Sequence, residues 1–416
     1  MHGGHFDQWS QTYRDHENGR DRDNPDSQTG LCLAATQGAF AVWLVGGVAL
    51  TWGDPEVGGD SHDVQNQLQN VKQIAASDYA FAAISAVSDR VTQVVTWGEP
   101  GAGGDSNSVQ DQLTNVCEIY GSHAAFAALL ADGRVVTWGD ADYGGDSNTV
   151  QEQLTDVQQI RCTASAFAVI CADGHVVAWG DPESGGDCTS VQDQLVEVSK
   201  LCASGGAFAA ILKGGSVVTW GNPEAGGESS EVQHLLNVRE VVASGGAFAA
   251  ILADGSVVTW GEPEIGGDSR AVREHLKEVK QVAATSMAFA ARTAGGRVVT
   301  WGQPEFGGDS SEVQHLLQDV QDITASVLGS AFAATLTNGR VITWGDAISG
   351  GDSTNVQDQL QNVCKIKGSG SAFAAICADG SHLRLVTWGD PESGGSSDIR
   401  QLQQLSMHSS ADPHLP

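Results

Sequence analysis

Carboxylates at two fixed places in a repeated motif are the residues of this chain best suited to binding chemistry. One set directly follows Trp-Gly and the other directly follows a later Gly-Gly. The candidate partner-binding residues are Asp54, Asp60, Glu99, Asp105, Asp140, Asp146, Asp181, Asp187, Glu228, Glu262, Asp268, Asp309, Asp346 and Asp352. Acidic loops of this kind suit a Lys/Arg-rich segment of another protein. Alternatively, each Asp only caps the turn that follows it, and the repetition of the motif favours this interpretation.

No catalytic or metal-binding pattern accompanies these carboxylates. The twelve histidines are scattered, and none lies in a repeated context with a nucleophile. The chain contains no phosphate loop, H-E-x-x-H or G-x-S-x-G motif, and its carboxylate spacing matches no EF-hand. The sequence therefore predicts a protein that is not an enzyme and that uses no metal or cofactor.

The eight cysteines form no C-x-x-C pair, and most replace apolar residues at equivalent repeat positions. Cys171 and Cys377, for example, stand where another repeat has Leu252. We interpret the cysteines as small core residues in a reducing compartment, with a zinc site as the alternative.

The overall charge limits the class of partner. The chain has 51 acidic and 21 Lys/Arg residues, a formal charge of −30. A field of this sign repels nucleic acid and anionic lipid, so we expect a protein partner and no direct nucleic-acid or membrane binding. With no secretory apolar region near the start and no long apolar run, we predict a cytoplasmic location, with the nucleus as the alternative. The sequence leaves the oligomeric state open.

The elements that position these residues come from a repeat. Trp-Gly closes a short apolar run nine times, at intervals of 40 to 45 residues. The tryptophans, which we predict to be structural core, are Trp52, Trp97, Trp138, Trp179, Trp220, Trp260, Trp301, Trp344 and Trp388. A fixed period near 40 residues indicates a repeat architecture. We assign residues 31–405 to it and predict disordered tails over 1–30 and 406–416.

Each repeat predicts three short antiparallel strands. In the sixth repeat these are the run ending at Ala243, then Ala247–Leu252 and Ser256–Trp260, with Asp254-Gly255 as a hairpin turn. Apolar residues at i, i+4 and i+7 after the acidic loop predict one or two helical turns between repeats. We expect each Trp and Phe to pack on the Ala-rich face of the neighbouring unit, in a closed ring of nine.

The order of Gly-rich turn, apolar strand, Asp-Gly and Val-x-x-Trp-Gly resembles the regulator-of-chromosome-condensation repeat. The resemblance implies an all-β fold, a β-propeller of about nine short, mostly three-stranded blades joined by short helical turns. Members of that family most often have seven blades. This chain also departs from the family in having Gly-Gly-Asp-Ser after Trp-Gly and Phe-Ala, as at Phe208-Ala209, in the second strand.

Our functional prediction is a non-catalytic protein-interaction scaffold that presents the acidic loops to a partner. The resemblance supplies the alternatives. One is a guanine-nucleotide exchange factor for a small GTPase. Weaker ones are a substrate-recognition module associated with ubiquitin ligation, for which the chain has no catalytic domain, and an ultraviolet sensor, whose Gly-Trp-Arg-His-Thr motif is absent.

Overall fold

The computed structural model describes residues 31–44, 47–88, 91–230, 232, 237–326, 329–379 and 382–396. The predicted tails, at 1–30 and 406–416, lie outside the described residues. So do residues 397–405, the last part of the range 31–405 that we assign to the propeller. Within the described residues the chain forms nine three-stranded antiparallel sheets, each built from consecutive strands. The prediction of an all-β propeller of nine three-stranded blades is therefore confirmed.

The blades share one plan of first, second and third strand. The first strands are β1 (Leu31–Ala35), β4 (Val71–Ala76), β7 (Val116–Gly121), β10 (Val157–Cys162), β13 (Val198–Ala203), β16 (Val238–Ala243), β19 (Val279–Ala284), β22 (Val320–Ala325) and β25 (Val363–Gly368). The second strands are β2 (Ala39–Leu44), β5 (Ala80–Ser88), β8 (Ala125–Leu130), β11 (Ala166–Cys171), β14 (Ala207–Leu212), β17 (Ala247–Leu252), β20 (Ala288–Thr293), β23 (Ala331–Leu336) and β26 (Ala372–Asp379). The third strands are β3 (Ala49–Gly53), β6 (Val91–Gly98), β9 (Val135–Gly139), β12 (Val176–Gly180), β15 (Val217–Gly221), β18 (Val257–Gly261), β21 (Val298–Gly302), β24 (Val341–Gly345) and β27 (His382–Gly389).

Short helical turns follow the third strands and join the blades. After Trp-Gly these are η2 (Pro55–Val57), η4 (Pro100–Ala102), η6 (Ala141–Tyr143), η8 (Pro182–Ser184), η10 (Pro223–Ala225), η11 (Pro263–Ile265), η13 (Pro304–Phe306), η14 (Ala347–Gly351) and η16 (Pro391–Gly395). Before the next blade come η3 (Gln65–Gln67), η5 (Gln110–Gln112), η7 (Gln151–Gln153), η9 (Thr189–Gln194), η12 (Arg273–His275) and η15 (Thr354–Gln359). The helical linkers expected from i, i+4, i+7 spacing are thus mostly single 3₁₀ turns. Leu113 still packs inward, but Val116 already belongs to β7.

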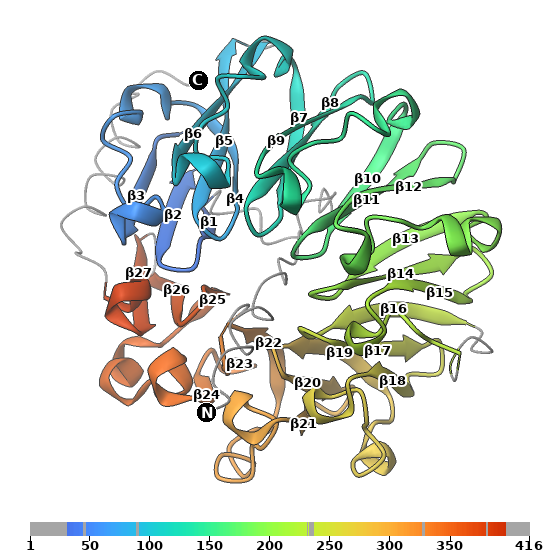
Figure 1. Ribbon diagram of the computed structural model, residues 1–416. Helices are drawn as coiled ribbons and strands as arrows, with labels where there is room; N and C mark the ends of the chain where they lie inside the picture. Colours follow the sequence, from blue (N-terminus) through green and yellow to red (C-terminus); the bar gives the residue numbers. More distant parts are fainter. Residues whose placement is uncertain are drawn as a thin grey trace, which may run out of the picture.

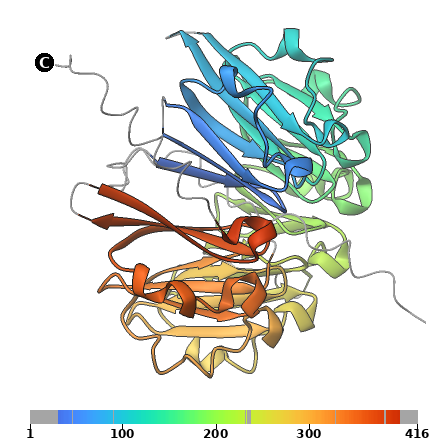
Figure 2. The ribbon, with the colours of Figure 1, turned by 90° about the vertical axis from the view of Figure 1, so that its left-hand side faces the viewer.

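The nine blades form a ring in which the first strands lie innermost and the third strands outermost (Figure 1). The last blade packs on the first, because η16 contacts β2 and β3, and Phe40 is buried with Ala372 and Ala374. Figure 2 shows the ring from the side, with the last blade beside the first. The chain therefore closes on itself, as the sequence predicts.

The ring has two different ends. At one end each first strand turns into the second, and each third strand finishes at Trp-Gly; we call this end the turn rim, which in the third blade comprises residues 122–124 and 140–144. At the other end lie the hairpins between second and third strands, such as residues 131–134, and we call it the hairpin rim. The antiparallel pairing of all three strands places these two sets at opposite ends.

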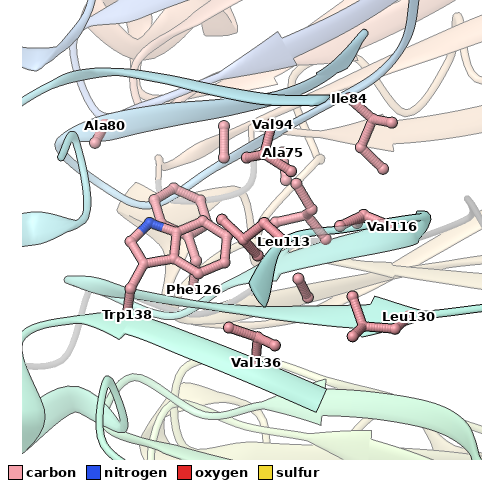
Figure 3. Close-up of a cluster of buried hydrophobic side chains, with 13 residues drawn as sticks. Ala75, Ala80, Ile84, Val94, Leu113, Val116, Phe126, Leu130, Val136 and Trp138 are labelled. Atoms are coloured by element: carbon pink, nitrogen blue, oxygen red, sulfur yellow. The ribbon is translucent and has the colours of Figure 1, made fainter. Parts of the chain in front are cut away.

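The core consists of layers between blades, and Figure 3 shows the layer between the second and third blades. Phe126 and Trp138 of the third blade pack there against a face of the second blade that includes Ala80 and Ala82. The two rings stack with centroids 5.2 Å apart, as the cross-strand register pairs Phe with Trp. Small residues on one blade thus receive the large residues of the next, as the sequence predicts.

Each of eight tryptophans also forms a hydrogen bond across the interface. The indole Nε1–H of Trp138 donates to the carbonyl of Gly103 in the preceding blade at 3.0 Å. Equivalent bonds are made by Trp97, Trp179, Trp220, Trp260, Trp301, Trp344 and Trp388. Trp52, in the first blade, is half-buried and stacks on Phe40. The repeated tryptophan thus packs in the layer between two blades and, through its indole N–H, forms a hydrogen bond that links them.

The core role expected for the cysteines holds for only some of them. Cys162, Cys171, Cys188 and Cys377 are buried, whereas Cys117 and Cys364 are exposed. Each exposed cysteine follows the first valine of its first strand, where the pairing register shifts by one residue. This bulge turns the side chain away from the core, so the expectation is wrong at these two positions.

Candidate interaction surface

The first acidic set lies in the turns that follow Trp-Gly. Asp54 Oδ1 accepts a hydrogen bond from the backbone N–H of Glu56 at 2.9 Å, and Asp140 binds the N–H of Asp142 in the same way. Asn222 performs this task in the fifth blade, accepting from the N–H of Glu224. An amide therefore caps the turn as well as a carboxylate does.

The second acidic set, which follows Gly-Gly, has the same local geometry. Each carboxylate accepts the backbone N–H of the residue two positions later, at 2.8 to 2.9 Å. The acceptors are Asp60, Asp105, Asp146, Asp187, Glu228, Asp268, Asp309 and Asp352. The turns that these bonds close are Asx-type turns, which differ from the caps of regular helices expected from the sequence.

The structure places both sets at the turn rim. Gly59 N–H donates to the carbonyl of Asp54 at 2.7 Å, which folds Asp60 back beside the end of the third strand. The next residue, Ser61, receives a hydrogen bond from Thr51 on that outermost strand at 2.9 Å. Six blades therefore present a carboxylate at both places, one at the Trp-Gly turn and one toward the outer edge of the same rim, whereas Asn222, Gln303 and Ser396 replace one of them in the fifth, seventh and ninth blades.

Few cations neutralise these carboxylates. Among the described residues, the ion pairs involving the two sets are limited to Asp268 with Arg270, at 2.6 Å. That guanidinium lowers the pKa of Asp268 to about 2. For Asp187 and Asp352 the pKa is lowered mainly by the backbone N–H groups of Thr189 and Thr354. Hydrogen bonds that favour the ionised form keep these groups negatively charged near neutral pH.

One part of the turn rim breaks the repeat and was missed by the sequence analysis. From the first blade to the seventh, the second residue after the first strand donates a backbone hydrogen bond to the next blade, such as Asp78 N–H to His123 O at 3.0 Å. In the eighth blade the acceptor is Gly329, which lies four residues after the first strand. In the first three blades the residue at this position is Gln37, Asp78 or His123. In the remaining blades it is Ala164, Gly205, Gly245, Ser286, Gly329 and Gly370. A comparison of the repeats position by position would have revealed this departure.

The large side chains at this position form one cluster with two tyrosines. Asp78, whose side chain is 4% exposed, lies with Oδ2 2.7 Å from Nδ1 of His123 and accepts a weaker bond from Gln37 at 3.4 Å. The His123 ring contacts Tyr79 edge-on, with centroids 5.0 Å apart, and Tyr143 at 4.7 Å. We call Gln37, Asp78, Tyr79, His123 and Tyr143 the His123 cluster.

The described residues offer little for metal or thiol chemistry. Within the described ranges, no group of three or more His, Cys, Asp or Glu side chains is arranged to hold a metal ion. Burial raises the pKa of Cys171 to about 11 and also raises those of Cys188 and Cys377, so these thiols stay protonated. None of the described helices has the length and apolar character needed to cross a membrane.

The fold and surface define a nine-bladed repeat β-propeller with an acidic rim. No family model matches the chain, and no curated protein matches it in sequence. Its shape is similar to Prp20p of Saccharomyces cerevisiae, with 13% identity over 92% of this chain and 98% of that chain and a TM-score of 0.44. It is also similar to human WBSCR16, with 16% identity over 62% of this chain and 79% of that one and a TM-score of 0.38.

A third similar structure is the computationally designed Ika8 protein, with 14% identity over 76% of this chain and 96% of that chain and a TM-score of 0.39. A structure of Kap60 bound to yeast RCC1 (Prp20) is also similar, with 14% identity over 95% of this chain and 97% of that chain and a TM-score of 0.42. Identities this low concern the fold alone, since one fold hosts many functions.

Proposed function

We propose that this protein is a non-catalytic interaction scaffold whose turn rim binds a Lys/Arg-rich segment of a partner protein. The observation that carries the proposal is the composition of the nine Trp-Gly turns, each taken from the Gly of Trp-Gly to the residue after the acidic position. They contain 22 of the 51 acidic residues and none of the 21 lysines and arginines. A surface of one charge sign steers and selects partners of the opposite sign.

Turn geometry does not account for this charge. Asn222 caps its turn without a charge, and Glu262 and Gln303 form no side-chain cap although η11 and η13 have the same turn conformation. An amide is as good a cap as a carboxylate. The preference for carboxylates therefore supports a role beyond folding.

The experiment compares charge removal at the two rims. The first variant carries Asp60→Asn, Asp105→Asn and Asp146→Asn at the turn rim. The matched control carries Asp132→Asn, Asp173→Asn and Asp254→Asn at the hairpin rim, where each Asp also accepts the N–H two residues later. Both variants lose three negative charges, and the amide oxygen of Asn can accept the same turn bond. Asn338 already does so at the hairpin rim.

Binding is measured by calorimetry with a synthetic Lys/Arg-rich peptide at 50 and 300 mM salt. We expect wild-type affinity to fall steeply with salt, and the turn-rim variant to bind several-fold more weakly than the hairpin-rim variant at 50 mM. Equal losses in the two variants would show that only net charge matters. Salt-independent binding would remove the proposed mechanism.

The cytoplasmic location is part of the same proposal, and microscopy of the tagged full chain would test it.

A further inference from the structure

The strongest asymmetry of the turn rim lies at the His123 cluster. Among the described residues, ring contacts consist of nine stacked Phe–Trp pairs, one in each blade, and the two contacts that His123 makes with Tyr79 and Tyr143. The Phe–Trp pairs belong to the core. The His123 contacts lie at the turn rim and involve side chains that are only half-buried. Among the described residues, the turn rim thus carries one group of rings that contact each other.

The backbone does not require this patch. The chain of hydrogen bonds between blades continues through Ala164, Gly205 and Gly245 with the same lengths, 2.7 to 3.0 Å. Small residues are therefore sufficient for the backbone bonds at this position. The long side chains of Gln37, Asp78 and His123 are not needed for those bonds. Gln37 donates to Asp78, Asp78 binds the imidazole of His123, and that imidazole contacts the rings of Tyr79 and Tyr143.

Acidic turns are fixed directly beside the rings. The backbone N–H of Glu99 donates to the carbonyl of Tyr79 at 2.9 Å, which joins the second blade's acidic turn to the cluster. Tyr143 itself belongs to the third blade's turn, where it follows Asp140 and Asp142, and Ser122 donates to its carbonyl at 2.8 Å. The carboxylates of Glu99, Asp140 and Asp142 belong to exposed residues. Residues with exposed carboxylates therefore adjoin both tyrosines along the backbone.

We propose that the His123 cluster is the anchor for one Lys or Arg side chain of the basic segment, an inference that rests on the proposed function. The cation lies against the rings of Tyr79 and Tyr143 and is bound by the carboxylates of the adjoining turns. Aromatic faces attract cations, and guanidinium groups also stack on them. His123 and Asp78 are positioning residues in this proposal, because His123 contacts both tyrosine rings, Asp78 holds the imidazole, and neither contacts the cation.

The test uses ring substitutions in the full chain and the same basic peptide. Tyr143→Leu and, separately, Tyr79→Leu remove an aromatic face while keeping apolar bulk. Phe306→Leu is the matched control, since Phe306 ends η13 as Tyr143 ends η6, is also half-buried and follows Glu305. Tyr143→Phe is the conservative variant. Circular dichroism verifies that each variant is folded before binding is measured.

We expect each Tyr→Leu variant to lose about tenfold in affinity, with Tyr143→Phe and Phe306→Leu close to wild type. The loss should be similar at 50 and 300 mM salt, because a direct contact is screened less than the long-range attraction of the rim. Wild-type affinity in both Tyr→Leu variants, or an equal loss with Phe306→Leu, would overturn the anchor.

The two proposals fail in different ways. If the Asp→Asn variants behave as proposed but the Tyr→Leu variants bind normally, the rim binds basic segments without this anchor. If the wild-type protein shows no salt-dependent binding of the peptide, the proposed function fails and the anchor fails with it. If only one Tyr→Leu variant weakens binding, the cation contacts that ring alone, and the two-ring arrangement is wrong.

Discussion

Two glycines in one turn provide a test of how the blades fit together. Gly103, at the first position of Gly-Gly, has a φ of +93°, and a Cβ there would lie 2.5 Å from the ring of Phe126 in the next blade. Gly101, two residues earlier in η4, has a φ outside the left-handed region, and its Cβ would meet nothing closer than 3.7 Å. The same substitution, Gly→Ala, is therefore incompatible at one position and compatible at the other.

The expected free energies follow from these distances. An alanine in a left-handed conformation costs about 1–2 kcal/mol. Displacing the fully buried Phe126 ring adds about 1–3 kcal/mol, the usual range for overpacking. Gly103→Ala should therefore destabilise the protein by about 2–5 kcal/mol. Gly101→Ala should be neutral or stabilise it by up to about 1 kcal/mol, because the unfolded chain loses freedom.

The assay is urea unfolding, followed by far-ultraviolet circular dichroism for wild type and both variants. The free energy of unfolding comes from linear extrapolation, and an unchanged m-value shows that the same structure unfolds. The carbonyl of Gly103 accepts the indole N–H of Trp138, so a backbone displacement at Gly103 in Gly103→Ala should also change the tryptophan fluorescence of the native state. A difference of less than about 1 kcal/mol between the two variants would refute the close approach of Gly103 to Phe126.

Two other predictions concern single contacts. Trp260→Ala should lower the free energy of unfolding by about 3–5 kcal/mol, since Trp260 is buried and stacked on Phe248. Trp260→Phe should lower it less, because that change removes mainly the hydrogen bond to Gly226. An unchanged melting temperature in Trp260→Ala would contradict this packing. Arg270→Gln should return the pKa of Asp268 from about 2 toward its usual range. A lowered pKa in the folded state stabilises the protein above pH ~4, and this contribution is lost as pH falls toward 2. The free energies of unfolding of wild type and variant, measured by urea unfolding, should therefore differ by less than about 1 kcal/mol above pH ~4 and converge near pH 2.

Most of the fold follows from the sequence because every blade repeats the same pattern of apolar strands and Gly-rich turns. Strand boundaries were predictable where Gly or Asp-Gly ends an apolar run: the second strand of the sixth blade is Ala247–Leu252, as expected. The first strand was less predictable, since it begins at Val238 and not near Val241. Its bulge between Val238 and Glu240 interrupts the alternation on which strand assignment depends.

The acidic turns were predictable in position but not in their relation to other blades. Their capping bonds join residues two positions apart, so spacing alone indicates them. The His123 cluster is different, because Asp78 and His123 are 45 residues apart and meet only when neighbouring blades close against each other. Nothing in the local sequence around either residue marks the contact. Only the departure from Gly, Ala or Ser at one repeat position signals it.

The division between repeated and unrepeated residues has a physical consequence for specificity. A contact repeated from blade to blade, such as the indole bond that eight tryptophans make to the preceding Gly-Gly loop, cannot fix where on the ring a partner binds. The acidic residues are also spread around the ring, so they attract a basic segment without setting its register. A register requires a site that occurs once, with short-range contacts. The His123 cluster meets both conditions, since the bond between Asp78 and His123 and the ring contacts of His123 have no counterpart in the other described blades.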